Sequence, residues 1–147
     1  MRGFLVDTNV LSEFSRRGAP DQRVKSWLGT AVPGSLYVSV LTLAEIRRGI
    51  ELLPPSKRRD QLERWFENDL LESFDDANVL PVTKAIGDRW AALSARAQGK
   101  GIQPSVIDGL VAATALEHDL TLVTRNVKDF EQLGVALFNP WAAQAAE

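Results

Sequence analysis

Five polar side chains stand where short apolar runs give way to helix-forming sequence. They are Asp7, Glu45, Asp108, Asn126 and Asp129. Taken one at a time, patterns such as Ser105-x-x-Asp108 are typical of a helix N-terminus. There a polar side chain caps the helix, and an acid is favoured by the helix dipole. Asp7 is the least ordinary of the five, because it directly follows the buried-strand pattern Phe4-Leu5-Val6.

The five side chains predict a catalytic or binding site when they are considered together rather than one at a time. In a parallel α/β sheet, the strand ends and the starts of the following helices gather at one edge, where such folds bind ligands. Carboxylates that meet there repel one another and raise each other's pKa. A hard divalent cation with oxygen ligands, Mg²⁺ or Mn²⁺, relieves that repulsion. The residues therefore predict a carboxylate-held cation and chemistry on phosphate.

The elements that must position these side chains alternate along the whole chain. Short apolar runs predict strands at Phe4–Val6, Leu36–Val40, Val79–Val82, Thr121–Val123 and Val135–Phe138. Helical spacing predicts helices from Thr8 to Gly18-Ala19-Pro20 and over 21–28, 42–53, 56–71, 83–98, 105–118 and 126–133. Pro54-Pro55 makes the third and fourth of these a helical hairpin. This alternation favours an α/β fold, a mostly parallel five-stranded sheet with helices on both faces.

Composition narrows the classes of function. The 147 residues carry a net charge of −2, so binding of nucleic acid requires a local basic patch. With no cysteine and one histidine, thiolate zinc sites, disulfides and multi-histidine metal sites are excluded. We expect one domain over residues 1–147. The apolar run near the N-terminus is too short for a signal peptide or a membrane span, so a cytoplasmic protein is expected.

Four segments, in order, resemble the sequence motifs of PIN-domain ribonucleases, specifically the VapC and FitB-like toxins. They are Leu5-Val6-Asp7-Thr8-Asn9, Leu43-Ala44-Glu45-Ile46-Arg47-Arg48-Gly49, Ile107-Asp108-Gly109-Leu110 and Val123-Thr124-Arg125-Asn126-Val127-Lys128-Asp129-Phe130. The closing Phe138-Asn139-Pro140-Trp141 is similar to that subgroup as well. The likeness covers nearly the whole chain.

The resemblance implies a three-layer α/β/α sandwich and an Mg²⁺-dependent endoribonuclease toxin, with Mn²⁺ as a substitute. By the same likeness, Asp7 and Asp108 are the metal ligands and Glu45 is the third acid. Many members have Asp where this chain has Asn126. An amide supplies no charge, and Asp129 can lend one, so we expect one tightly held ion.

Further residues are assigned supporting roles. Asn9 and Thr124 are expected to steer Asp7 and the phosphate, with ordinary turn hydrogen bonding as the other interpretation. Arg47 and Arg48 follow Glu45 closely, so one of them could hold an RNA phosphate.

The resemblance also implies partners. They are an RNA substrate, a VapB-type antitoxin that silences the toxin, a second copy of the chain in a homodimer, and operator DNA bound through the antitoxin. Trp65 and Phe66 on the hairpin could form an exposed apolar groove for the antitoxin.

Two alternatives stay open at this stage. One is a catalytically inactive PIN scaffold that only binds protein, although retention of the three acids argues against it. The other is an Mg²⁺-dependent phosphatase, which also begins with an Asp after a strand. Its usual second Asp is replaced here by Asn9.

Overall fold

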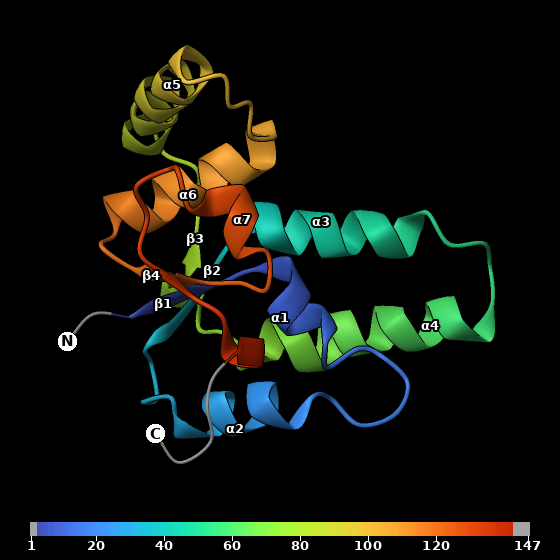
Figure 1. Ribbon diagram of the computed structural model, residues 1–147. Coiled ribbons are helices and arrows are strands. Elements are labelled where there is room, and N and C mark those ends of the chain that lie inside the picture. Colours follow the sequence, from blue (N-terminus) through green and yellow to red (C-terminus); the bar gives the residue numbers. More distant parts are fainter. Residues whose placement is uncertain (1–2, 143–147) are drawn as a thin grey trace.

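A single five-stranded sheet organises the chain (Figure 1). The computed structural model describes residues 3–142. The strands are β1 (Phe4–Val6), β2 (Leu36–Ser39), β3 (Val79–Leu80), β4 (Thr121–Val123) and β5 (Leu137–Phe138). They lie in the order β3-β2-β1-β4-β5, and each of the four neighbouring pairs is parallel. The predicted α/β sheet is confirmed.

Helices cover both faces of the sheet (Figure 1). They are α1 (Thr8–Ser12), α2 (Gln22–Thr30), α3 (Val40–Glu51), α4 (Lys57–Arg64), α5 (Lys84–Gly99), α6 (Val106–Glu117) and α7 (Val127–Phe130). The shorter turns are η1 (Trp65–Leu70), η2 (Leu71–Ser73), η3 (Asp76–Asn78) and η4 (Pro140–Ala142). The hairpin of α3 and α4 extends sideways from the body, and α5 stands on α6 at the opposite end.

The strands are buried on both sides, and this explains their continuous apolar runs. Successive strand residues point to opposite faces. Leu5 and Leu122 pack in the core beneath α5 and α6, whereas Val6 and Val123 pack in the core with α1, α2 and α3. A strand buried on both faces has no polar side, so it cannot show the alternating pattern of a surface strand.

The strand order sets the place of the site. From β1 the chain builds outward through β2 and β3, and it then returns to the other side of β1 for β4 and β5. The connection therefore reverses between β1 and β4. In parallel sheets, the crevice beyond the carboxyl ends of the strands at such a reversal is where ligands bind. Asp7 follows β1 and Thr124 follows β4 at this point.

Several predicted boundaries were wrong. The first helix ends at Ser12 rather than at Gly18, and β2 stops at Ser39 because Val40 already begins α3. The predicted helix 56–71 is α4 followed by one π-helical stretch and one 3₁₀ turn, so the number of residues per turn changes along its apolar face.

None of the helices within residues 3–142 combines the length and apolar character needed to cross a membrane.

Candidate active site

Asp7 is a buried carboxylate at the end of β1, with 7% of its surface exposed. Its Oδ1 accepts the backbone N–H of Thr8 at 2.9 Å, so it caps α1 as well. Its Oδ2 accepts the hydroxyl of Thr124 at 2.8 Å and lies 3.5 Å from the amide nitrogen of Asn9. These donors fix the orientation of the carboxylate, and each oxygen keeps acceptor capacity for a further ligand.

Thr124 joins the ends of β1 and β4. Its side chain is fully buried, and its Oγ1 accepts the amide of Asn9 at 3.3 Å and the backbone N–H of Asn126 at 3.0 Å. Asn9 reaches back across the same gap, because its Oδ1 accepts the backbone N–H of Arg125 at 3.1 Å. Asn9 and Thr124 thus contact Asp7 directly, in the arrangement expected of positioning residues.

Glu45 is brought to this edge by α3. The hydroxyl of Thr8 donates to its Oε1 at 2.9 Å, which ties the second acid to the residue that follows Asp7. The predicted start of the helix 42–53 was wrong, because Ser39 is the N-cap of α3. The Thr42 hydroxyl is instead buried, and it has no hydrogen-bond partner among residues 3–142.

Asp108 stands in the first turn of α6, and here the capping pattern is confirmed. The Ser105 hydroxyl accepts the backbone N–H of Asp108 at 3.1 Å, and its contact with the Asp108 carboxylate lowers the pKa of that acid, against the effects that raise it. Gly109 follows because α5 packs closely at this point. A Cβ there would lie 2.9 Å from the Trp90 indole. The side chain of Trp90 therefore helps to set the position of α6 and of Asp108.

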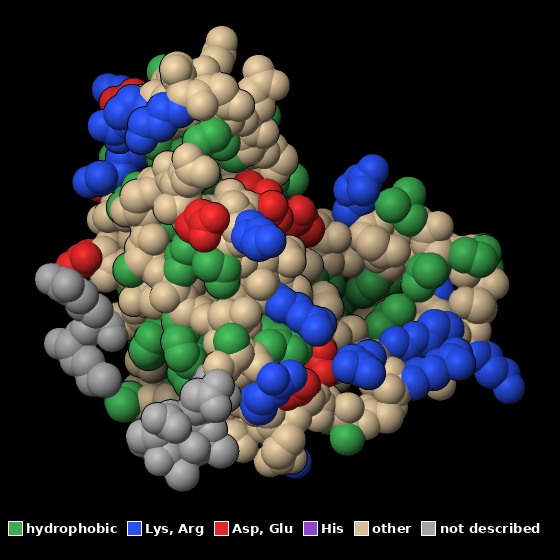
Figure 2. Space-filling view, in the orientation of Figure 1, with side chains coloured by type: hydrophobic (Ala, Val, Ile, Leu, Met, Phe, Trp, Pro, Cys, Tyr) green, Lys and Arg blue, Asp and Glu red, His purple; other side chains and the backbone are tan. Residues whose placement is uncertain are grey.

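The acids repel one another across the crevice. Burial raises the pKa of Asp7 above its usual value; the hydrogen bonds from Thr8 and Thr124 oppose this rise, and the charges of Glu45 and Asp129 add to it. The pKa of Asp108 is also raised, chiefly by its burial and then by the charges of Asp7 and Asp129. Figure 2 shows acidic side chains gathered over α6, α7 and the start of α3, with basic side chains beside them.

The donor set fits a hard divalent cation of low protein coordination. Within residues 3–142, no three acidic or histidine side chains are close enough to form a ready-made metal cage. Mg²⁺ does not need one, since it commonly keeps several waters and takes one or two carboxylates plus substrate phosphate. The pair of the buried Asp7 and the half-buried Asp108, whose charges repel one another, matches that requirement.

The remaining predicted residues take different positions. Asn126 and Asp129 lie at the start of α7 with exposed side chains, and the Asn126 side chain makes no capping hydrogen bond. Arg47 forms ion pairs with Glu51 at 3.2 Å and Glu67 at 3.4 Å and lies over the Phe66 ring, and its role in holding a phosphate stays a prediction. Arg48 is exposed.

Sequence reasoning missed Thr8 and Arg125. Thr8 lies between Asp7 and Asn9, and Arg125 lies between Thr124 and Asn126. Their place beside predicted site residues is the feature of the sequence that could have indicated them.

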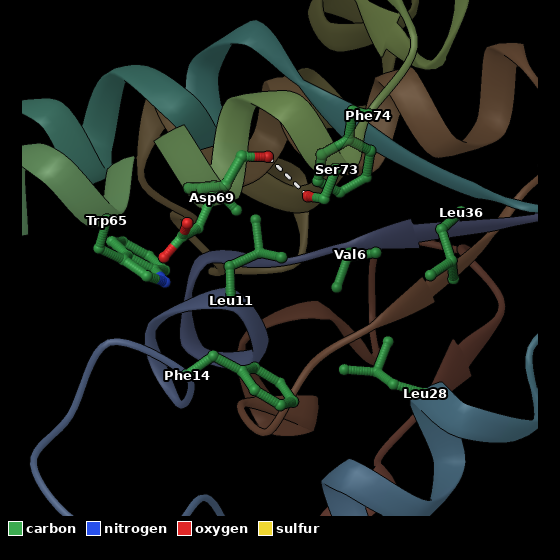
Figure 3. A pocket seen from close by; sticks show the side chains of 10 residues that line it. Val6, Leu11, Phe14, Leu28, Leu36, Trp65, Asp69, Ser73 and Phe74 are labelled. Carbon is green, nitrogen blue, oxygen red and sulfur yellow. Dashed lines mark hydrogen bonds between the residues drawn. The ribbon is translucent and has the colours of Figure 1, made fainter. Parts of the chain in front are cut away.

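An apolar hollow of about 300 Å³ lies on the other side of α1 (Figure 3). Leu11, Phe14, Trp65 and Phe74 are among the side chains that line it, and Asp69 is its one charged lining residue. The expectation that Phe66 is exposed was wrong, because this side chain is buried in the core below α3. It is Trp65 that reaches the hollow.

Comparisons with known proteins agree with this geometry. The family model "PIN domain" matches residues 4–135. The chain is 36% identical to Toxin FitB of Neisseria gonorrhoeae over 93% of this chain and 97% of that protein. It is 34% identical to VapC ribonuclease Y4jK of Sinorhizobium fredii, over 93% and 96%. A solved structure of FitAB bound to a DNA fragment has 34% identity, covers 98% of this chain and 99% of that one, and superposes with a TM-score of 0.88.

Proposed function

The chain belongs to the PIN-domain family, and on that premise we propose that it is an Mg²⁺-dependent endoribonuclease toxin that acts in the cytoplasm. The observation that carries the proposal is the buried Asp7 carboxylate, oriented by Thr124 and repelled by neighbouring acids at the sheet reversal. One of its relatives is named a VapC ribonuclease, which supports RNA as the substrate.

Each residue of the candidate site has its own role in the proposed hydrolysis of a phosphodiester. Asp7 and Asp108 would hold the cation, and Asn9 and Thr124 keep Asp7 in place through their hydrogen bonds. A divalent cation held there would supply Lewis-acid chemistry, which polarises phosphoryl oxygens and lowers the pKa of water. Glu45, held by Thr8, is placed to orient the attacking water. Asp129 adds negative charge to the same crevice, and Asn126 offers an uncharged oxygen beside it.

The antitoxin belongs to the same proposal. An antitoxin partner is supported because a relative is named a toxin and a FitAB complex is solved on DNA. We propose the hollow as the place of a VapB-type antitoxin segment, because its lining is mainly apolar. Phe14, 37% exposed at this hollow, offers an apolar contact. Phe14→Glu should weaken a co-purified toxin–antitoxin complex while leaving RNA cleavage intact. Unchanged complex stability would place the antitoxin elsewhere. A homodimer and a larger operator-bound assembly are parts of this proposal.

The test is cleavage of a single-stranded RNA by the purified chain in Mg²⁺ and in EDTA. We expect cleavage in Mg²⁺ alone, lost in Asp7→Asn. Asp88→Asn, which neutralises an exposed acid on α5, is the matched control and should cleave normally. Hydrolysis of p-nitrophenyl phosphate without RNA cleavage would favour the phosphatase alternative. Absence of both activities, with normal folding, would favour a scaffold that only binds protein.

A further inference from the structure

Arg125 stands at the carboxyl end of β4, directly beside the candidate active site. Its backbone N–H donates to Asn9 Oδ1 at 3.1 Å, and Asn9 in turn contacts Thr124. Its guanidinium lies over the Trp141 ring, 5.2 Å from the centroid. The backbone and the head of this side chain are therefore both positioned, although the residue itself is exposed.

Trp141 gives the guanidinium a rigid support. The indole is buried, with 5% of its surface exposed, and its backbone N–H donates to Asn139 Oδ1 at 2.9 Å. A cation over an aromatic face is attracted by the ring, and a planar guanidinium stacks on it more fully than an ammonium can. This gives a physical role to the closing Phe138-Asn139-Pro140-Trp141 segment, which the catalytic residues leave unexplained.

A polar cavity of about 480 Å³ opens beside Arg125. It is lined by Arg125, Asn126, Val127, Lys128, Asp129 and Asn139. Among the described residues its lining holds two cations and one acid, whereas the charges that act on Asp7 are those of the acids Glu45 and Asp129. Because the Trp141 ring is buried beneath Arg125, the cavity offers charge and hydrogen-bond donors rather than a stacking surface for a base.

We infer that this cavity is a subsite for an RNA phosphate neighbouring the scissile one, with Arg125 as its principal ligand and Lys128 in support. The inference rests on the proposed ribonuclease function and adds a positioning residue to it. An arginine fork binds two phosphate oxygens at once. A phosphate held here anchors the strand beside the acids without specifying sequence. The acids repel RNA, so a cationic anchor beside them is needed to hold the strand in register.

The test compares Arg125→Gln with Arg23→Gln in the full chain. Arg23 is an exposed arginine on α2, paired with Asp21, so its variant removes the same charge elsewhere. A labelled 20-nucleotide poly(U) RNA is titrated in EDTA at several salt concentrations, and cleavage is followed in Mg²⁺. We expect Arg125→Gln to raise Kd and KM about tenfold, as loss of one charge-assisted contact does. The plot of log affinity against log salt should become shallower by about 0.7.

The expected split is a raised KM with kcat within about threefold of the native value, as for loss of ground-state binding. Arg125→Lys should recover part of the affinity, because it keeps the charge but not the fork. Equal affinity and salt dependence in Arg125→Gln and Arg23→Gln would overturn the subsite, as would a fall in kcat alone. If the native chain neither binds nor cleaves RNA, the proposed ribonuclease function is wrong. If the native chain binds and cleaves RNA but Arg125→Gln behaves like Arg23→Gln, only the subsite is wrong.

Discussion

Replacing Thr124 by valine tests the positioning of Asp7 most directly. Valine keeps the shape of threonine, so the fully buried site is neither emptied nor overpacked. The change removes the 2.8 Å hydrogen bond to the Asp7 carboxylate and the acceptor for Asn9. It also removes the acceptor of the Asn126 N–H, but Asn126 is exposed and water can replace that partner.

The expected cost follows from the charge of Asp7. A hydrogen bond to a charged group contributes about 1.5–3 kcal/mol, so we expect the free energy of unfolding to fall by about 2–3 kcal/mol at pH 7. Thr124→Ser is the matched control. It keeps the hydroxyl and loses one buried methyl group, which costs about 1 kcal/mol. The pH dependence is a second signature, because the bond weakens when Asp7 is protonated and the deficit of the valine variant should shrink in acid.

The assay is urea unfolding of the native chain and both variants in EDTA, at pH 7 and in acid. RNA cleavage in Mg²⁺ is measured in parallel, and the serine variant should retain most of it. A valine variant as stable as the serine variant at pH 7 would refute the reasoning. So would a deficit that acid leaves unchanged, since the bond would then not depend on the charge of Asp7.

Three further predictions concern the same site, and a fourth concerns the buried Thr42 of α3. Asp108→Asn should reduce Mg²⁺-dependent cleavage at least about 100-fold with little change in Tm, because the variant keeps the backbone N–H that donates to Ser105 and an amide of the same shape as the carboxyl group. A large loss of stability would contradict this assignment. In EDTA the free energy of unfolding should fall as pH rises above 3.8. The reason is that the raised pKa values of Asp7 and Asp108 make the folded chain bind these protons more tightly than the unfolded chain does. Urea titrations in which stability rises with pH over that window would contradict the prediction. Mg²⁺ at 100 times its Kd should stabilise the native chain by about 2.7 kcal/mol and leave Asp7→Asn unmoved in thermal melts. Thr42→Val should stabilise the fold by about 1 kcal/mol, since it removes a buried hydroxyl without a partner, whereas Thr42→Ser should not.

The sequence by itself determined the class of fold and was enough to nominate the acids of the candidate site. Apolar runs between helical segments were enough to predict a parallel sheet, because strands buried on both faces leave that pattern. Asp7 and Asp108 could be chosen because each stands at the start of a helix, and Glu45 because it lies in the helix that follows β2; parallel strands bring the starts of such helices to one edge. The Ser105 cap was also readable, since it is local in the chain.

Tertiary structure decided what depends on contacts between distant segments. The hydrogen bond from Thr124 to Asp7 spans 117 positions, and no local pattern encodes which side chain meets which across β1 and β4. The same holds for Arg125 over Trp141, for the ion pair between Arg47 and Glu67, and for the burial of Phe66. Residue type and spacing fix the secondary structure. Which side chains meet, and how far each is removed from water, is decided only when the helices and the sheet pack against one another.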